Sequence, residues 1–293
     1  MNAFTIKDLE NLSGIKAHTI RIWEQRYSFL KPQRSDTNIR YYSNNELKTI
    51  LNISLLNKYG YKISHIDQMS EVEMQDKILA LSNLEAQQEM VVNELIIELV
   101  DLDLDMFEKV LSDHIRAKGI ERSITQLIFP FLERIGVLWV TNHINPAQEH
   151  LVTNIIRQKL IVGIDGIKSN SRPKKTALLF LPEGEHHELG LLYVCYLLKT
   201  KGIQVLYLGT NVPMKDIDYV AKLKKPDFLY AHLTSVAHNF NFGKFLTNMH
   251  TKLPDHPIVV SGHLTQSYKK KLPAKIELKR SLQEVIDYIA SIS

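Results

Sequence analysis

A polar loop in the second half of the chain holds the side chains best suited to metal chemistry. The apolar run from Thr176 to Leu181 has the length of a buried strand, and the loop after it, from Pro182 to His187, concentrates carboxylates and imidazoles. Carboxylates and imidazoles can act as acids, bases or metal ligands, although a lone loop histidine is more often solvated or hydrogen-bonded. The loop is therefore a candidate for such chemistry, and its residue types alone leave the role of each side chain open.

The elements around this loop form a strand, helix and strand unit that ends at Pro213. From Leu189 the chain has the pattern of a helix, and Gly190 has no side chain, so a bulky group can lie against the backbone there. In an open parallel sheet, strand ends and helix N-termini converge at the carboxyl edge and leave a crevice in which ligands bind. We therefore expect the loop to line a ligand-binding edge.

The motif Glu185-x-His187-x-x-Gly190, with the loop Asn211-Val212-Pro213 after the next strand, resembles the Asp-x-His-x-x-Gly signature of cobalamin-binding domains. The resemblance implies that His187 is the lower axial ligand of the cobalt and that Gly190 lies beside the ligand. It implies that Glu185 orients the imidazole from one methylene further out than the usual Asp. It also implies a cofactor-binding part for Leu233 and Gly262, which match a Ser-x-Leu and a Gly-Gly that line the nucleotide tail in that family.

Two positions depart from the family pattern, because Ala231 stands in place of the Ser and His263 in place of the second Gly. These departures leave open an alternative in which the domain keeps its fold but no longer binds cobalamin. A second alternative is a zinc-like site built from Glu185 and the histidines at other strand ends, His232, His238 and His263. No HxH, HExxH or CxxC spacing supports that site, and a lone loop histidine is usually solvated or hydrogen-bonded.

The composition is that of an ordinary globular chain. Its 293 residues predict two or three domains, and 44% hydrophobic with 23% charged residues are typical of a soluble protein. The only cysteine, Cys195, lies in an apolar helical run, which excludes a disulfide framework and fits a reducing, cytoplasmic setting. No apolar run reaches membrane-spanning length, and the N-terminus lacks a signal-peptide pattern, so we expect neither export nor a membrane partner.

The charge of the chain is concentrated at its start. Residues 1–70 contain ten Lys or Arg and six Asp or Glu, so they carry the whole formal excess of +4. The remaining residues are balanced. This asymmetry predicts a polyanionic partner for the N-terminal segment.

The N-terminal segment has helix-turn-helix spacing. The run from Thr5 to Asp8 predicts a capped short helix, and Ser13-Gly14 predicts a turn. Residues 16–26 predict a second helix with Ile20 and Trp23 on its inner face. Residues 27–42 then predict a two-stranded wing around an Asp-Thr-Asn turn, and two further helices follow. The run from Thr19 to Tyr42 closely resembles the MerR-type winged helix, which implies binding to double-stranded DNA.

The candidate DNA contacts form two groups. Short polar and basic side chains at the exposed start of the second helix suit the major groove, and these are Lys16, His18, Thr19 and Arg21. On the wing, Arg34 and Arg40 suit phosphate, which fixes position without reading sequence. Tyr41, at the base of the wing, is the last candidate, and the alternative is that its ring packs in the protein core instead of contacting DNA. Each residue alone is usually part of a solvated face, but helix, wing and charge together favour DNA binding.

Between the two ends, residues 71–168 show helical periodicity and no strand signal. Runs at 84–100, 102–118 and 120–141, and a capped helix that starts at Asn145-Pro146, predict a four-helix bundle. Trp139 is followed after nine residues by Glu149-His150. This spacing resembles the bundle in light-sensing, adenosylcobalamin-dependent MerR regulators, where it covers the upper face of the corrin. The alternative is a core Trp beside a surface Glu-His pair.

The remaining chain alternates helices and strands, which predicts five parallel strands. The expected fold class is thus multidomain α and α/β: a winged helix-turn-helix at 1–72, a helical bundle at 73–170 that caps cobalamin, and a Rossmann-like doubly wound parallel sheet at 175–293. Residues 169–175 have the composition of a linker.

The function expected from these features is that of a non-enzymatic transcriptional regulator, with repression as the expected sense. Its oligomeric state, dimer or tetramer, and its DNA binding would respond to a corrinoid, with adenosylcobalamin as the expected form and light as a possible second input. A corrinoid carrier in an enzyme system would leave the winged helix without a purpose.

Overall fold

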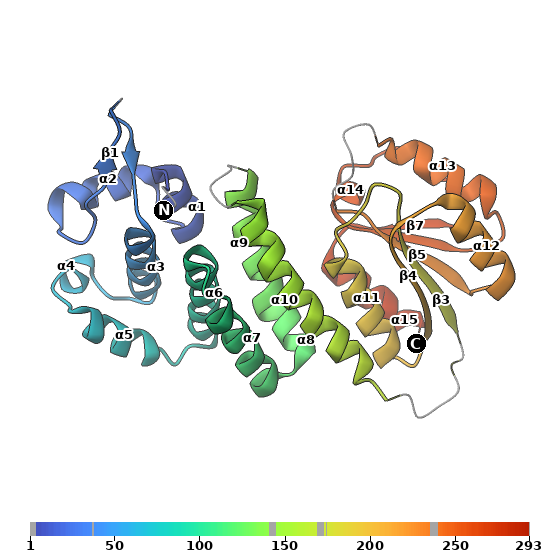
Figure 1. Ribbon diagram of the computed structural model, residues 1–293, viewed down its shortest axis with the longest axis horizontal. Coiled ribbons are helices and arrows are strands. Elements are labelled where there is room, and N and C mark those ends of the chain that lie inside the picture. Colours follow the sequence, from blue (N-terminus) through green and yellow to red (C-terminus); the bar gives the residue numbers. More distant parts are fainter. Residues whose placement is uncertain are drawn as a thin grey trace. The chain divides into compact units, whose positions relative to one another are not determined.

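The computed structural model describes residues 4–36, 38–140, 145–168, 173, 175–234 and 240–292. The chain forms two compact units, residues 1–156 and 157–293 (Figure 1). Within the described ranges, no helix is both long and apolar enough to cross a membrane. Most of the expected linker at 169–175 lies outside the described residues.

The first unit begins with a helix-turn-helix and a wing. Its elements are α1 (Ile6–Ser13), α2 (Ala17–Arg26), β1 (Gln33–Arg34), β2 (Arg40–Tyr41), α3 (Asn44–Lys58), α4 (Ile63–Ile66) and α5 (Glu71–Leu79). Figure 1 shows the β1–β2 hairpin extending away from the helices. Thr5 and Asp8 form a reciprocal capping box at the start of α1, as the sequence predicts. α4 is a single turn, shorter than the helix predicted from Ile63 onward.

The inner face of α2 is the predicted one. Ile20 and Trp23 are buried, and Trp23 packs edge-on against Phe29 with ring centroids 5.9 Å apart. Between α1 and α2, Gly14 takes a left-handed backbone angle, φ 73°, that closes α1 and turns the chain. The recognition helix is therefore anchored on one side and exposed on the other.

The second part of the unit is helical. It contains α6 (Leu84–Asp101), α7 (Leu104–Lys118), α8 (Ile120–Ser123), the π-helical turn η1 (Ile124–Ile128), α9 (Phe129–Val140) and the first half of α10 (Pro146–Asp165), which continues into the second unit. The predicted helix at 120–141 is thus interrupted by a π turn, in which the Phe129 amide donates to the Ile124 carbonyl. The next residue, Pro130, has no amide hydrogen with which to restore the α pattern.

The second unit is a five-stranded sheet with helices on both faces. Its elements are β3 (Thr176–Pro182), α11 (Leu189–Thr200), β4 (Gln204–Val212), α12 (Met214–Lys224), β5 (Phe228–His232), α13 (Phe242–Lys252), β6 (Ile258–Ser261), α14 (His263–Gln266), β7 (Ile276–Lys279) and α15 (Leu282–Ile292). Figure 1 shows α11 and α15 on one side of the sheet and α12 and α13 on the other. All four strand pairs are parallel, so the predicted sheet is confirmed.

The strand order, β4-β3-β5-β6-β7, fixes where a ligand can enter. After β3 the chain moves to β4 at one side, then returns to β5 at the other side of β3. At such a switch point the connections diverge, and the crevice opens beyond the carboxyl ends of the strands. The polar loop from Pro182 to His187 lies at that end of β3.

Candidate functional site

The loop between β3 and α11 is tied to the end of β4. Gly184 donates its amide to the Asn211 Oδ1 at 3.0 Å, and the Asn211 amide donates to the Glu185 carbonyl at 3.1 Å. Asn211 itself has a positive φ of 55°, a conformation that asparagine tolerates better than most residues. The two bonds fix the backbone at Glu185, so its side chain has a defined direction.

Glu185 is fully buried and its carboxylate collects donors from two strand ends. One oxygen, Oε1, accepts the backbone amides of His186 and His187, each at 2.9 Å. The other oxygen, Oε2, accepts the Thr234 amide beyond β5 at 2.8 Å. A buried carboxylate is stable only when it is hydrogen-bonded in this way, and here the bonds also join β3 to β5 across the switch point.

The same carboxylate orients the His187 ring. His187 Nδ1 lies 2.6 Å from Glu185 Oε1. A carboxylate that already accepts amide hydrogens acts as an acceptor, so Nδ1 carries a proton, and in the neutral form of the ring the lone pair is on Nε2. The His187 side chain is 43% exposed whereas that of Glu185 is 0% exposed. Metal-ligating histidines commonly have one ring nitrogen held by a carboxylate in this way.

Gly190, one turn further on, lies against the His232 ring. A Cβ at Gly190 would overlap the His232 Nε2, so the bulky neighbour expected at this glycine is a side chain of the protein itself. His232 Nδ1 is 2.8 Å from the Ser261 Oγ, which also accepts the Tyr230 hydroxyl at 2.8 Å. Burial lowers the pKa of His232 to about 4, with Glu185 opposing that shift, so the ring is neutral near pH 7.

Glu188, directly after His187, joins the loop to two further elements. Its Oε2 accepts from Arg157 Nε at 2.6 Å, and its Oε1 accepts the Tyr207 hydroxyl of β4 at 2.9 Å. Arg157 lies on α10, at the first residue of the second unit. The His187 backbone is therefore held on both sides, by Glu185 before it and by Glu188 after it.

The positions that match the cobalamin pattern or depart from it at the ends of β5 and β6 differ in burial. Ala231 and Leu233 belong to the apolar core of the second unit. Gly262 has φ 101°, and a Cβ there would overlap the Leu233 carbonyl oxygen, so glycine is required. His263 is exposed at the start of α14, and His238 lies outside the described residues. Among the residues that the structure describes, no group of three His, Cys, Asp or Glu could hold a metal ion.

The candidate DNA contacts of α2 lie on its solvent side. Lys16, His18 and Arg21 are exposed and Thr19 is half-buried. Lys16 makes an ion pair with Glu10 at 3.4 Å, and Thr19 Oγ1 is 3.3 Å from the His18 ring. The structure therefore gathers all four residues on the first turns of the recognition helix, the part that reaches bases in helix-turn-helix domains.

The wing residues differ from one another in their contacts. Arg34 is exposed and donates to Asn38 Oδ1 at 2.6 Å. Arg40 donates from Nε to Glu24 Oε2 at 3.0 Å, so the wing is fastened to α2. Glu24 also accepts the hydroxyl of the buried Tyr42, whereas Tyr41 donates to Gln33 Oε1 across the hairpin at 2.6 Å. Arg40 and Tyr41 thus brace the wing in addition to any contact with DNA.

The bundle residues proposed to cover a ligand are only partly described. The Trp139 side chain lies outside the part of the chain that the structure describes. Glu149 accepts from Thr153 Oγ1 at 2.8 Å and pairs with the exposed His150 ring at 3.1 Å, one turn after the cap of α10. The predicted cap is confirmed, because Asn145 Oδ1 accepts the Ala147 amide and Gln148 Oε1 accepts the Asn145 amide.

Comparison with known families assigns three segments of the chain. Residues 4–72 match the MerR HTH family regulatory protein, residues 176–278 match a B12 binding domain, and residues 91–162 match a second type of B12 binding domain. The chain thus combines a segment similar to the MerR HTH family with two segments similar to B12 binding domains. The expected combination of domains is confirmed, and it includes the helical segment as well as the sheet.

Relatives of known function have the same arrangement along most of their length. The chain is 27% identical over 259 residues to the HTH-type transcriptional repressor CarA of Myxococcus xanthus, covering 88% of this chain and 85% of that protein. It is 25% identical over 273 residues to the HTH-type transcriptional repressor CarH of the same organism, covering 91% of each. A monomethylamine corrinoid protein of Methanosarcina barkeri shares the fold, with 14% identity and a TM-score of 0.56 over 70% of this chain and 100% of that one.

Several residues that shape the B12-binding domain were not among the sequence candidates. Thr234 contributes only a backbone amide, for which no side-chain pattern exists. Arg157 and Tyr207 lie 31 and 19 residues from Glu188, their common partner, so neither has a local signal. Asn211 was recognised only as part of a loop motif. Its bonds to residues 184 and 185 show why an asparagine stands there.

We expect Gly190→Ala to destabilise the B12-binding domain by about 1–3 kcal/mol, because the added methyl group overlaps the His232 ring. The free energy of unfolding from urea denaturation measures this effect. The double variant Gly190→Ala with His232→Ala should recover part of the loss, since the smaller side chain leaves room for the methyl group. Strictly additive effects of the two substitutions would show that the contact does not limit stability.

We expect Arg40→Ala in the MerR-type domain to weaken binding to specific and random duplexes alike. Loss of one phosphate contact should lower the slope of log K against log salt by about one. Titrations at several salt concentrations measure that slope. Arg21→Ala is the comparison, for which we expect selective loss at one base of the site. An unchanged slope for Arg40→Ala would assign this arginine to bracing Glu24 alone.

Proposed function

We propose that the chain binds a corrinoid through His187 and that the bound corrinoid controls its binding to DNA. The observation that carries the proposal is the buried Glu185 carboxylate, which holds Nδ1 of His187 and thereby directs the lone pair to Nε2. The donor set fits the group, since a neutral imidazole with a carboxylate behind it is a strong axial ligand. Glu185 stands where the family signature has Asp, and it keeps the carboxylate that holds the imidazole.

We propose adenosylcobalamin as the physiological form, with Trp139, Glu149 and His150 as the residues that cover its upper side. When bound, such a ligand supplies a cobalt–carbon bond that light can break. A flat apolar Trp suits an adenosyl group, and the Glu149–His150 pair near a helix start suits its polar edge. This assignment is supported by the match of residues 91–162 to a B12 binding domain.

We propose that ligand and DNA are linked through assembly of a homodimer or homotetramer. A ligand that prefers one oligomer shifts the population toward it, and the number of linked winged helices sets how many half-sites are bound together. The two Myxococcus xanthus relatives are transcriptional repressors, which supports repression as the outcome of DNA binding. We place this activity in the cytoplasm, and it includes no enzymatic step. Corrinoid-dependent assembly would change DNA affinity without any new contact to DNA.

The test is an absorption spectrum of the protein purified in the dark with adenosylcobalamin. We expect a coloured complex that survives gel filtration. Its absorption spectrum should differ from that of free adenosylcobalamin, because the His187 imidazole replaces the lower base of the ligand. Parallel gel filtration with and without illumination reports the oligomeric state. A colourless protein under these conditions would overturn the proposal and establish a domain that keeps the fold without the ligand.

A further inference from the structure

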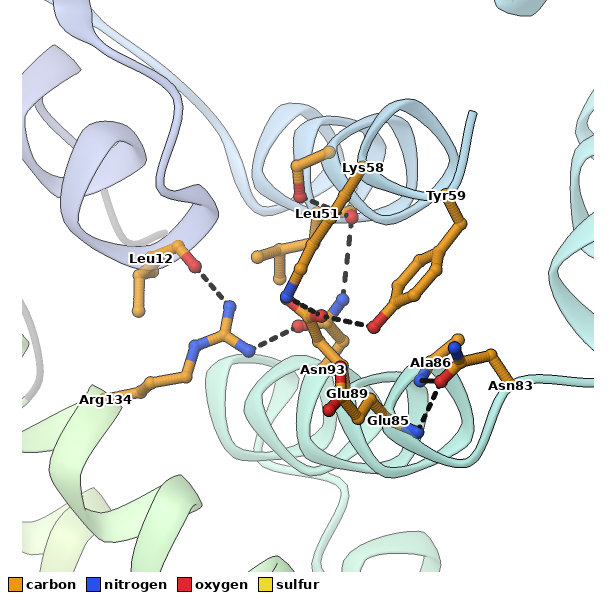
Figure 2. A network of polar contacts seen from close by, with 11 residues as sticks. Leu12, Leu51, Lys58, Tyr59, Asn83, Glu85, Ala86, Glu89, Asn93 and Arg134 are labelled. Atoms are coloured by element: carbon orange, nitrogen blue, oxygen red, sulfur yellow. Dashed lines mark hydrogen bonds and ion pairs between the residues drawn. The ribbon is translucent and has the colours of Figure 1, made fainter. Parts of the chain in front are cut away.

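A half-buried arginine connects the bundle to the end of the first helix of the helix-turn-helix. Arg134, on α9, donates from Nη2 to the Leu12 carbonyl and from Nη1 to Asn93 Oδ1 at 2.6 Å. Figure 2 shows the guanidinium lying between Leu12 of α1 and Asn93 of α6. One side chain therefore spans three helices, two of the bundle and one of the DNA-binding domain.

The Leu12 carbonyl is an acceptor that α1 itself cannot satisfy. α1 ends at Ser13, and the last four carbonyls of a helix lack amide partners within it. The Gly14 amide at the cap returns to the Glu10 carbonyl, not to that of Leu12. A guanidinium at this end also complements the helix dipole, which is negative at the C-terminus. Arg134 thus supplies a donor to the C-terminal end of α1, which Gly14 closes, from the helical bundle.

Asn93 directs the guanidinium and extends the contact to α3. It is 4% exposed, and its Nδ2 lies 3.5 Å from the Leu51 carbonyl in the middle of α3. With Nδ2 turned toward α3, Oδ1 is turned toward Arg134. The polar contact therefore reaches both α1 and α3, the helices that precede the recognition helix and follow the wing in the chain (Figure 2).

The environment makes these bonds costly to lose. Burial lowers the pKa of Arg134, and the Glu89 carboxylate, which also pairs with Lys58 at 2.7 Å, partly offsets that shift. A guanidinium stays charged even when it is partly desolvated, so its burial is tolerated only where its donors are paired. The paired guanidinium therefore links the bundle to the DNA-binding domain.

We infer that Arg134 is a positioning residue for DNA binding, which holds the helix-turn-helix at a fixed angle on the bundle through the Leu12 carbonyl. Leu12 lies two residues before the Gly14 turn and five before α2 begins, so fixing it fixes the start of the recognition helix. A pre-set orientation removes an ordering cost that binding would otherwise include. The inference requires no corrinoid, so it stands or fails independently of the proposed function.

The test compares full-length Arg134→Met with the wild type on the tightest duplex that the wild type selects from a random library. We expect about tenfold weaker binding, the effect of losing one charge-assisted hydrogen bond from the bound geometry. The salt slope should not change, because Arg134 does not meet phosphate. Amide hydrogen exchange at residues 13–16 should become faster in the protein without DNA.

Arg122→Met is the matched control, because Arg122 is an exposed arginine of the same bundle. Arg134→Lys keeps the charge but not the two-pronged geometry, and should recover part of the affinity. If Arg134→Met fails to fold, Arg134→Lys and Asn93→Leu decide the matter by the same titrations. Unchanged affinity in a folded variant, even with lower stability, overturns the inference. So does a lowered salt slope, which would make Arg134 a DNA contact.

Discussion

His187→Ala should abolish retention of cobalamin while leaving basal DNA binding intact. Removing an outer partner of a metal ligand costs roughly 10–100-fold in affinity, and removing the ligand itself should cost more. The methyl side chain of alanine offers no lone pair, and Glu185 would then face solvent-accessible space with fewer donors. The winged helix belongs to the other compact unit, so its fold does not depend on this ring. Equilibrium dialysis and the absorption spectrum measure retention, and titration of a duplex measures DNA binding.

His186→Ala is the control for this experiment. His186 lies next to His187 on the same exposed loop, and its contribution to Glu185 is a backbone amide that alanine retains. We therefore expect wild-type retention and an unchanged spectrum. If the bound cobalamin gives the same spectrum in His187→Ala as in the wild type, His187 is not its axial ligand, whatever the affinity.

The sequence predicts those parts of the site whose partners lie within a few residues of each other. The cap at Thr5 is confirmed, as are the helices of the doubly wound domain, because caps and periodicity are local. The Glu185–His187 pair was found for the same reason. Its residues are two apart, and each side chain has a typical role at a strand end.

Contacts between residues that lie far apart in the sequence could not be predicted from it. The partner of Glu185 at Thr234 is a backbone amide, and any residue type other than proline could supply it. Arg134 has the spacing of an ordinary polar position on α9, and nothing in its neighbours marks the Leu12 carbonyl as its acceptor. The interruption at η1 shows the converse, because Pro130 is visible in the sequence but its effect depends on how the bundle packs.

The placement of Arg134 bears on how a signal could travel. α9 carries Arg134 and also Trp139, which we propose as a cover for the ligand, and a helix transmits displacement along its axis as a rigid element. Ligand binding near the end of α9 and the Arg134 contact with α1 from its middle would then bias the same element. Measuring DNA affinity of Arg134→Met with and without adenosylcobalamin gives the coupling free energy directly, since a shared element makes the two effects non-additive.

Glu185→Gln should both destabilise the B12-binding domain and weaken its hold on cobalamin. The carboxylate accepts on both oxygens, whereas an amide accepts on only one. With its oxygen toward His187, the new amide group faces the Thr234 N–H. In the reverse orientation it faces the donors at residues 186 and 187. Either way a buried donor loses its acceptor, and we expect a loss of about 2–4 kcal/mol in the free energy of unfolding.

Urea denaturation with an unchanged m-value measures that loss, and dialysis against cobalamin measures the second effect. Glu183→Gln is the matched control, because Glu183 is an exposed carboxylate of the same loop. Glu185→Asp should retain more of both properties, since it keeps both acceptor oxygens and shortens only the reach. Were Glu185→Gln as stable as the wild type and equally able to bind cobalamin, the carboxylate would be neither the anchor of the loop nor the partner that fixes the His187 tautomer.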